Sequence, residues 1–137
     1  MAQFVIVHGA WHGAWCWKQI LPALRAARHE VHTVSLTGTG ERAHSLSANI
    51  NLRTHIEDVL AVIRHEELND LVLVGHSYAS MVITGVADEL LKNMGHPLKH
   101  LVYLDAVTPH NGESWSSCPS PETRATRIAR AAEQGGL

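Results

Sequence analysis

The sequence predicts an α/β fold built on a parallel sheet, because apolar runs typical of buried strands alternate with helical patterns. Continuous runs rich in Val and Leu fit parallel strands that are buried on both faces. Such runs occupy residues 4–8, 71–74 and 101–104, and a weaker one occupies residues 32–36. We therefore expect four parallel strands.

Helical patterns fill the intervals between these strands. Apolar residues recur at a spacing of three or four over residues 15–28, 52–65 and 77–91. Strand and helix thus alternate from the first strand to the fourth, which is the pattern of a parallel sheet with helices packed on its faces. We find no internal repeat and no second domain in the sequence.

The character of the chain changes after Val107. Residues 108–121 are rich in Pro, Ser, Gly and Asn and predict a loop. A last helix is expected over residues 122–134, with Ser120 as its N-cap. Because Ile128 is the only large apolar residue in this segment, we expect the helix to pack against another part of the protein.

Composition and charge exclude several classes of function. The chain has 137 residues, 45% of them hydrophobic and 18% charged, which is ordinary for one soluble globular domain. A net charge of −2 indicates no basic face, so we expect no nucleic-acid partner. Without a basic leader or an apolar run of roughly 18 residues, we expect a cytoplasmic protein with no membrane partner. Cys16 and Cys118 are then expected to be free thiols.

The segment GHSYA, residues 75–79, places Ser77 between a predicted strand and a predicted helix. A serine at such a turn has its hydroxyl lifted clear of the sheet, beside free N–H groups that favour developing negative charge. The turn also needs small residues two positions before and after the serine, and Gly75 and Ala79 meet that need. The pattern predicts a catalytic nucleophile, although an ordinary helix N-cap is the alternative interpretation.

A second loop, His8-Gly9-Ala10, follows the first predicted strand. The carboxyl ends of parallel strands lie at the same edge of a sheet, so this loop and the serine turn are expected to meet there. Acyl transfer needs two N–H donors for the oxyanion, and the amides of Ala10 and Tyr78 are the candidates. The alternative is that these three residues form a plain turn.

Four segments together resemble the α/β-hydrolase fold family: FVIVHGAWHGAWCW, LTGTGER, VGHSYASMVITGVAD and HLVYLDAVTPHNGES. More closely, they resemble its small bacterial esterases, which are related to plant methylesterases and hydroxynitrile lyases. The resemblance covers residues 4 to about 114. It implies a three-layer parallel-sheet fold and a serine hydrolase of small carboxylic esters that needs no cofactor and no metal.

The same resemblance implies roles for individual residues. Ser77 is the nucleophile, and Ala10 and Tyr78 are the oxyanion donors. Gly9 and His76 are similar to the esterase branch, because the lyases tend to carry a threonine and a glutamate at those places. The supporting residues of the site are His8, Gly9, Gly75 and His76. One departure is Ser80, which stands where relatives usually have glycine.

The larger departure concerns the rest of the triad. In this fold the order along the chain is Ser, then Asp or Glu, then His. The histidines that follow the serine are His96, His100 and His110. Of these only His110 follows a strand at the correct edge, and it is not the family's histidine. Asp105 is a candidate acid, although an aspartate there is more often structural.

We therefore expect the chain to be the N-terminal half of such an enzyme, truncated after the strand over residues 101–104. It would form a single partial domain over residues 1–137, with the core over 1–107 and the start of a cap region over 108–137. The last strand would then have an unpaired apolar edge, which predicts an oligomeric or marginally stable chain. The alternative function is a non-catalytic remnant or a ligand-binding protein with the same fold.

Two further motifs match sites that we do not expect. Residues 38–43 read G-x-G-x-x-A, a dinucleotide fingerprint, but they follow the second strand and do not open a packed helix. His8 and His12 have the spacing of a zinc helix, but they lie in a loop and Gly9 replaces the glutamate. Three tryptophans could either line an acyl pocket or pack the first helix: Trp11, Trp15 and Trp17.

Overall fold

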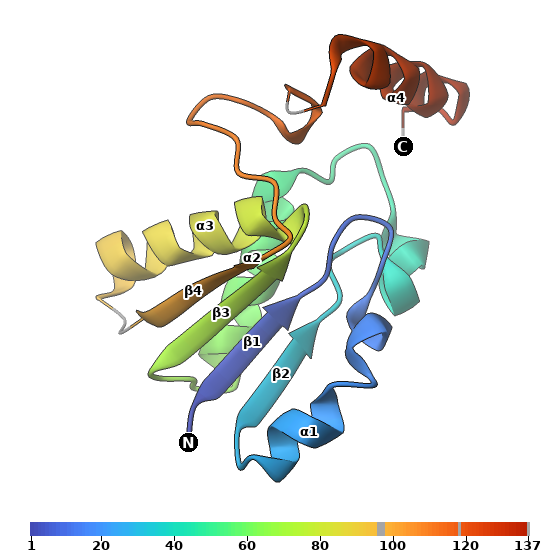
Figure 1. Cartoon of the computed structure of the whole chain (residues 1–137). Helices are drawn as coiled ribbons and strands as arrows, with labels where there is room; N and C mark the ends of the chain where they lie inside the picture. Colours follow the sequence, from blue (N-terminus) through green and yellow to red (C-terminus); the bar gives the residue numbers. More distant parts are fainter. Residues whose placement is uncertain (96–97, 118, 137) are drawn as a thin grey trace.

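The computed structural model describes residues 1–95, 98–117 and 119–136, and its centre is a parallel sheet of four strands. The strands are arranged in the order β2-β1-β3-β4 (Figure 1). Their bounds are β1 (Gln3–Val7), β2 (Glu30–Val34), β3 (Leu71–His76) and β4 (Leu98–Leu104). All four predicted strands are confirmed, with individual ends shifted by no more than three residues.

Helices cover both faces of the sheet and complete three layers. On one face lie α2 (Leu52–His65) and α3 (Ala79–Glu89), and on the other lie the 3-10 turn η1 (Ala14–Trp17) and α1 (Leu21–Ala26) (Figure 1). The predicted single helix over residues 15–28 is therefore wrong in detail. Pro22 stands in the first turn of α1. A proline has no N–H to donate and suits the start of a helix, so two short elements form in place of one.

The larger core lies between the sheet and the pair α2 and α3. Strand residues such as Val5 and Leu73 meet helix residues such as Val59 and Ile83 there, all fully buried. The two helices approach closely, because a Cβ on Gly85 of α3 would lie 2.3 Å from Cδ1 of Ile56 on α2. The smaller core, on the α1 face, joins Ile6, Val31 and Trp17. Its buried residues lie on β1, β2 and η1, and the partly buried Val74 of β3 packs against them.

The start of α2 is set by a reciprocal cap. The side chain of Asn51 accepts a hydrogen bond from the amide of Thr54, and the Thr54 hydroxyl accepts one from the amide of Asn51. This capping box satisfies two amides that would otherwise have no partner. It places His55 in the first turn of α2, near the edge of the sheet where the strands end.

β4 forms one end of the sheet and leaves apolar side chains in solvent. Val102, Tyr103 and Leu104 are 39%, 43% and 46% exposed. In the described ranges, β3 is the one strand that pairs with β4. The unpaired apolar edge predicted for this strand is thus observed, whereas self-association through it stays a prediction.

The residues after β4 lead away from the sheet. They form a long loop that contains the 3-10 turn η4 (Trp115–Ser117), and then the helix α4 (Pro121–Glu133). The predicted N-cap is confirmed, because the Ser120 hydroxyl accepts a hydrogen bond from the amide of Thr123 at 3.2 Å. Figure 1 shows α4 beyond the carboxyl edge of the sheet, and no side chain of α4 is buried. That residues 108–137 begin a cap region remains a prediction.

Two other short elements lie in the described connections. They are the 3-10 turn η2 (Gly40–Ser45) and the π-helical turn η3 (Leu90–Met94), which follows α3 and ends at the left-handed Gly95. Of the helices that the structure describes, none combines the length and the apolar character needed to cross a bilayer.

Candidate active site

Ser77 occupies a strained turn between β3 and α3. Its φ is +52°, in the left-handed region that non-glycine residues rarely adopt. The turn is tight, because a Cβ on Gly75 would lie 2.8 Å from the carbonyl oxygen of Ala79. The end of β4 and the segment after it hold the turn in place. The amide of Ser77 donates to the carbonyl of Leu104 at 3.2 Å, and the carbonyl of Ser77 accepts from the amide of Val107 at 3.4 Å.

The loop after β1 packs directly against this turn. A Cβ on Gly9 would lie 3.1 Å from the Cβ of Ser77 and 2.9 Å from Nδ1 of His76. The expectation that the two loops meet is therefore confirmed, and only glycine fits at position 9 without displacing a neighbour. Among the described residues, the amides of Ala10 and Tyr78 donate to no other group of the chain.

Ser80, the departure from the family pattern, lies in the first turn of α3 and is buried. Its hydroxyl contacts the carbonyl oxygens of Ser77, at 2.8 Å, and of Val107. A glycine could make neither contact. The serine therefore ties the turn to the segment that follows β4.

His8 supports the first loop from beneath. The side chain is fully buried, its Nδ1–H donates to the carbonyl of Gly9 at 2.7 Å, and its Nε2 accepts from the amide of Leu36 at 3.1 Å. Burial lowers the pKa of His8 below its usual value, because desolvation disfavours the charged imidazolium. His8 thus joins the ends of β1 and β2 as a neutral side chain.

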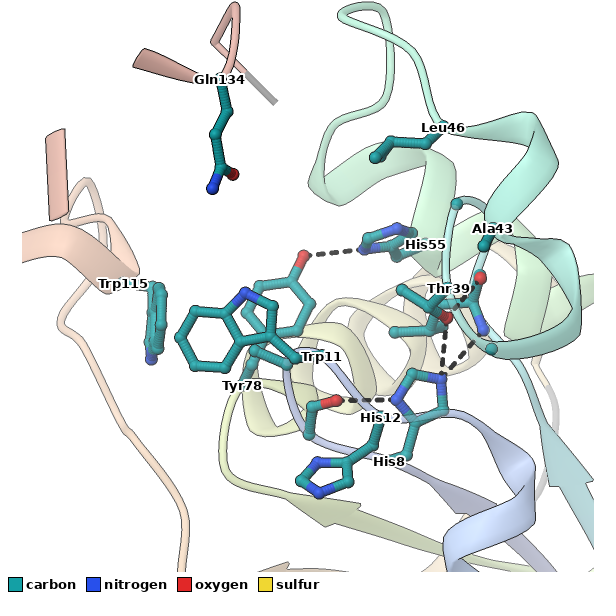
Figure 2. A pocket seen from close by; sticks show the side chains of 15 residues that line it. His8, Trp11, His12, Thr39, Ala43, Leu46, His55, Tyr78, Trp115 and Gln134 are labelled. Carbon is teal, nitrogen blue, oxygen red and sulfur yellow. Dashed lines mark hydrogen bonds between the residues drawn. The ribbon is translucent and has the colours of Figure 1, made fainter. Parts of the chain in front are cut away.

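A cavity of about 520 Å³ opens beside the two loops (Figure 2). Its wall includes part of the glycine-rich segment that resembles a dinucleotide fingerprint, where Gly38 and Gly40 have positive φ. That segment forms the short 3-10 turn η2, which buries no side chain, so the helix that a dinucleotide phosphate needs is not formed there. The side chains labelled around the cavity are His8, Trp11, His12, Thr39, Ala43, Leu46, His55, Tyr78, Trp115 and Gln134.

The three early tryptophans have different surroundings. Trp11 lines the cavity and meets Trp115 edge to face, with 5.6 Å between ring centroids. Trp17 packs into the smaller core, whereas Trp15 is half exposed. Trp11 therefore lines a cavity, whose use as an acyl pocket stays a prediction, and the packing interpretation holds for Trp17. The contribution of Trp115 was missed, because its place in the chain predicts only a loop.

His55 is another cavity residue that the sequence patterns did not indicate. Its Nδ1 lies 2.9 Å from the hydroxyl of Tyr78, and its Nε2 lies 3.0 Å from the carbonyl oxygen of Thr37. Burial raises the pKa of the Tyr78 hydroxyl to about 12, so the hydroxyl remains protonated. The available signal was the position of His55 in the first turn of a helix that begins near the carboxyl edge of the sheet.

A second cavity of about 270 Å³ lies on the α1 face, next to the same turn. Among its lining residues are His12, His76 and Asp105. Asp105 follows β4 directly, is exposed, and has a φ of +44°. The predicted candidate acid therefore lies at the same edge of the sheet as Ser77, where it shares a cavity with two histidines.

The later histidines lie elsewhere. His100 is exposed on β4 opposite Val72, at the end of the strand remote from the serine turn. His110 is exposed in the loop after β4, where its amide donates to the carboxylate of Glu113 at 2.8 Å. His96 and Cys118 fall outside the described residues, and Cys16 is a free thiol. Within the described ranges, no three His, Cys, Asp or Glu side chains are grouped so as to hold a metal ion.

Several known proteins are similar to this chain in sequence. A carbendazim hydrolyzing esterase from Nocardioides sp. (strain SG-4G) is 54% identical over 114 residues, which are 83% of this chain and 46% of the esterase. Methylesterase 10 from Arabidopsis thaliana is 30% identical over 110 residues, which are 79% of this chain and 38% of that protein. The chain thus spans about half, or less, of the length of these curated relatives.

The structural comparison agrees. An extracellular α/β-hydrolase from a Paenibacillus species superposes with a TM-score of 0.88 and 26% identity, covering 99% of this chain and 53% of that one. The model of the alpha/beta hydrolase family matches residues 4–136. The predicted resemblance and fold class are confirmed, and the chain belongs to the α/β-hydrolase family.

Proposed function

We propose that this protein is a serine hydrolase of small carboxylic esters, with Ser77 as its nucleophile. The observation that carries the proposal is the backbone of Ser77, held at a positive φ between β3 and α3 with the Gly9 loop packed against its Cβ. Strain of this kind at a strand-to-helix turn is typical of a serine whose hydroxyl is exposed for attack. The name of the Nocardioides relative, an esterase, supports the same reaction class.

In the proposed reaction, the Ser77 oxygen attacks the carbonyl carbon of the ester while a general base takes its proton. The carbonyl oxygen becomes an oxyanion, to which the amides of Ala10 and Tyr78 donate hydrogen bonds. Collapse of the tetrahedral intermediate breaks the bond to the alcohol oxygen, which receives the proton held by the base, and leaves the acyl group on Ser77. Water then attacks that acyl group as it gives a proton to the same base, and the return of this proton to the serine oxygen releases the carboxylic acid and restores the serine hydroxyl.

A second candidate function is ligand binding without turnover. The position of His100, at the end of β4 remote from the serine turn, favours it, because a serine without a base is a poor nucleophile at neutral pH. Asp105 is the candidate acid of the catalytic proposal. The binding proposal keeps the same 520 Å³ cavity and needs neither an acid nor a base.

Serine-directed labelling separates the two candidates. Under catalysis, a fluorophosphonate probe is expected to form an adduct with Ser77, located by peptide mass spectrometry, and Ser77→Ala abolishes it. Ser47→Ala, which changes an exposed serine far along the chain, is the matched control and retains labelling. A folded protein that stays unlabelled would contradict the catalytic proposal and leave ligand binding.

A further inference from the structure

The side chain of Tyr78 brings a polar group into a largely apolar part of the cavity. Its ring meets Trp115 edge to face with 6.2 Å between centroids, and its hydroxyl is directed toward His55 (Figure 2). The backbone amide of the same residue is one of the proposed oxyanion donors. A ligand that reaches the Ser77 turn is therefore close to the Tyr78 side chain as well.

The partner of His55 on its other side determines which way the hydrogen bond to Tyr78 runs. Nε2 of His55 faces the carbonyl oxygen of Thr37 at 3.0 Å, and a carbonyl oxygen only accepts hydrogen bonds. Nε2 must therefore carry a hydrogen. In a neutral imidazole the other nitrogen is then an acceptor, so the Tyr78 hydroxyl donates its hydrogen to Nδ1 of His55.

Thr37 is itself held in place, which fixes this arrangement. Its amide and its hydroxyl donate to the two carboxylate oxygens of Asp58, at 2.6 and 2.7 Å. Arg42 donates to the same carboxylate at 3.0 Å. The carbonyl of Thr37, the ring of His55 and the hydroxyl of Tyr78 thus form one oriented chain of hydrogen bonds, anchored by a largely buried carboxylate.

The hydroxyl of Tyr78 has a single hydrogen, and this hydrogen is used in the hydrogen bond to His55. What remains toward the cavity is the lone-pair side of the oxygen, which accepts a hydrogen bond and cannot donate one. Since burial keeps the hydroxyl protonated, the oxygen that accepts a hydrogen bond from the ligand is that of a neutral phenol and not of a phenolate. A ligand group with an N–H or O–H satisfies it, whereas a group with only lone pairs is repelled.

On the basis of the proposed esterase function, we propose that the Tyr78–His55 pair determines specificity. It selects esters that carry an N–H or O–H donor on the part of the molecule lying in the 520 Å³ cavity. Esters without such a donor leave the lone pair of the Tyr78 oxygen that faces the cavity without a hydrogen-bond donor, in a partly buried site. An unpaired buried polar atom is unfavourable, so the preference is for the donor and against its absence.

The test compares methyl phenylacetate with its ortho, meta and para hydroxy derivatives. Equilibrium binding is measured by quenching of tryptophan fluorescence, since Trp11 and Trp115 line the cavity. The Ser77→Ala background prevents turnover, and about pH 8 keeps histidine side chains ordinarily neutral. At least one hydroxy isomer is expected to bind about three- to tenfold more tightly than the parent ester, the range of one net hydrogen bond.

Two variants assign the preference to its cause. Tyr78→Phe is expected to abolish the gain, whereas Tyr103→Phe keeps it, because the Tyr103 hydroxyl bonds to Thr84 on α3 and does not line the cavity. In His55→Leu the hydrogen of the Tyr78 hydroxyl no longer bonds to His55 and can be donated to the ligand. The methyl ether of the preferred isomer is therefore expected to bind more tightly to this variant than to the parent protein.

The outcomes separate this inference from the proposed function. A gain that survives Tyr78→Phe, or failure of all four esters to bind, would overturn the specificity proposal. A donor preference that Tyr78→Phe removes supports it even if Ser77 resists the fluorophosphonate, in which case only the catalytic proposal fails.

Discussion

The two faces of the sheet differ in how completely they are covered. On the face of α2 and α3, strand residues such as Leu73 are fully buried. On the face of α1, Val102 pairs in register with Val74 yet is 39% exposed, because no described element covers β4 there. Stability is therefore concentrated on the face of α2 and α3, while the other face presents an apolar surface to solvent. Ser77 lies at the edge shared by the two.

The largest effect expected is on the covered face. Leu73→Ala should lower the free energy of unfolding by about 2–5 kcal/mol, since it leaves a cavity in a close-packed core. Leu104→Ala, which makes the same change at a side chain that is 46% exposed, should lower it by no more than about 1 kcal/mol. Urea unfolding measures both, and equal losses would contradict the contrast between the faces.

A smaller effect is expected where the covered face meets the serine turn. Gly75→Ala places a methyl group 2.8 Å from the backbone oxygen of Ala79, and overpacking of this kind costs about 1–3 kcal/mol. Gly85→Ala is the matched change, and its methyl would lie 2.3 Å from Cδ1 and 2.9 Å from Cγ1 of Ile56. These atoms belong to a side chain that can change its rotamer, whereas the backbone oxygen of Ala79 cannot move in this way, and alanine also favours the helix. Thermal unfolding should therefore rank Gly75→Ala as the more damaging of the two. The opposite order would show that the turn can relax.

The pH dependence of stability should reveal His8, the buried histidine at this edge. Its pKa is lowered in the folded state, so the unfolded chain binds the extra proton first as the pH falls. The stability that His8 contributes is present above about pH 6.5, the unfolded value, and is lost as the pH falls through the lower folded value. His8→Gln should remove that component of the slope.

Urea unfolding across this pH range measures the slope for each variant. His65→Gln changes an exposed histidine and should leave the slope as it is in the parent protein. Parallel slopes for the parent protein and His8→Gln would contradict the role assigned to burial.

The smallest effect on stability is expected on the uncovered face. Val102→Glu should change the free energy of unfolding by no more than about 0.5 kcal/mol. It should nevertheless reduce self-association in sedimentation velocity, because a charge interrupts the apolar surface beside the free edge of β4. Leu91→Glu, at an exposed leucine after α3, is the control and should leave association unchanged. A parent chain that is monomeric at all concentrations would remove the prediction of an oligomer.

Local sequence determined much of the fold and part of the site. The four strands follow from continuous apolar runs. The helix cap at Ser120 and the turn at Ser77 follow from the residue types that such positions require. Gly9 and Gly75 were predictable because a turn that brings backbones together excludes a side chain. Pro22 also indicated that the helix predicted over residues 15–28 would be divided, although the apolar spacing around it favours a continuous helix.

Only the tertiary structure decided which distant residues meet at the site. His55 and Tyr78 are 23 positions apart, and Thr37 is 18 positions before His55, so no local pattern links the three. Their contact depends on the order of the strands and on the point at which α2 begins. The sequence by itself determined the elements and the turn at Ser77, because these depend on neighbours in the chain. The tertiary structure decided the cavity and its hydrogen-bond direction, because these depend on groups that only the folded sheet brings together.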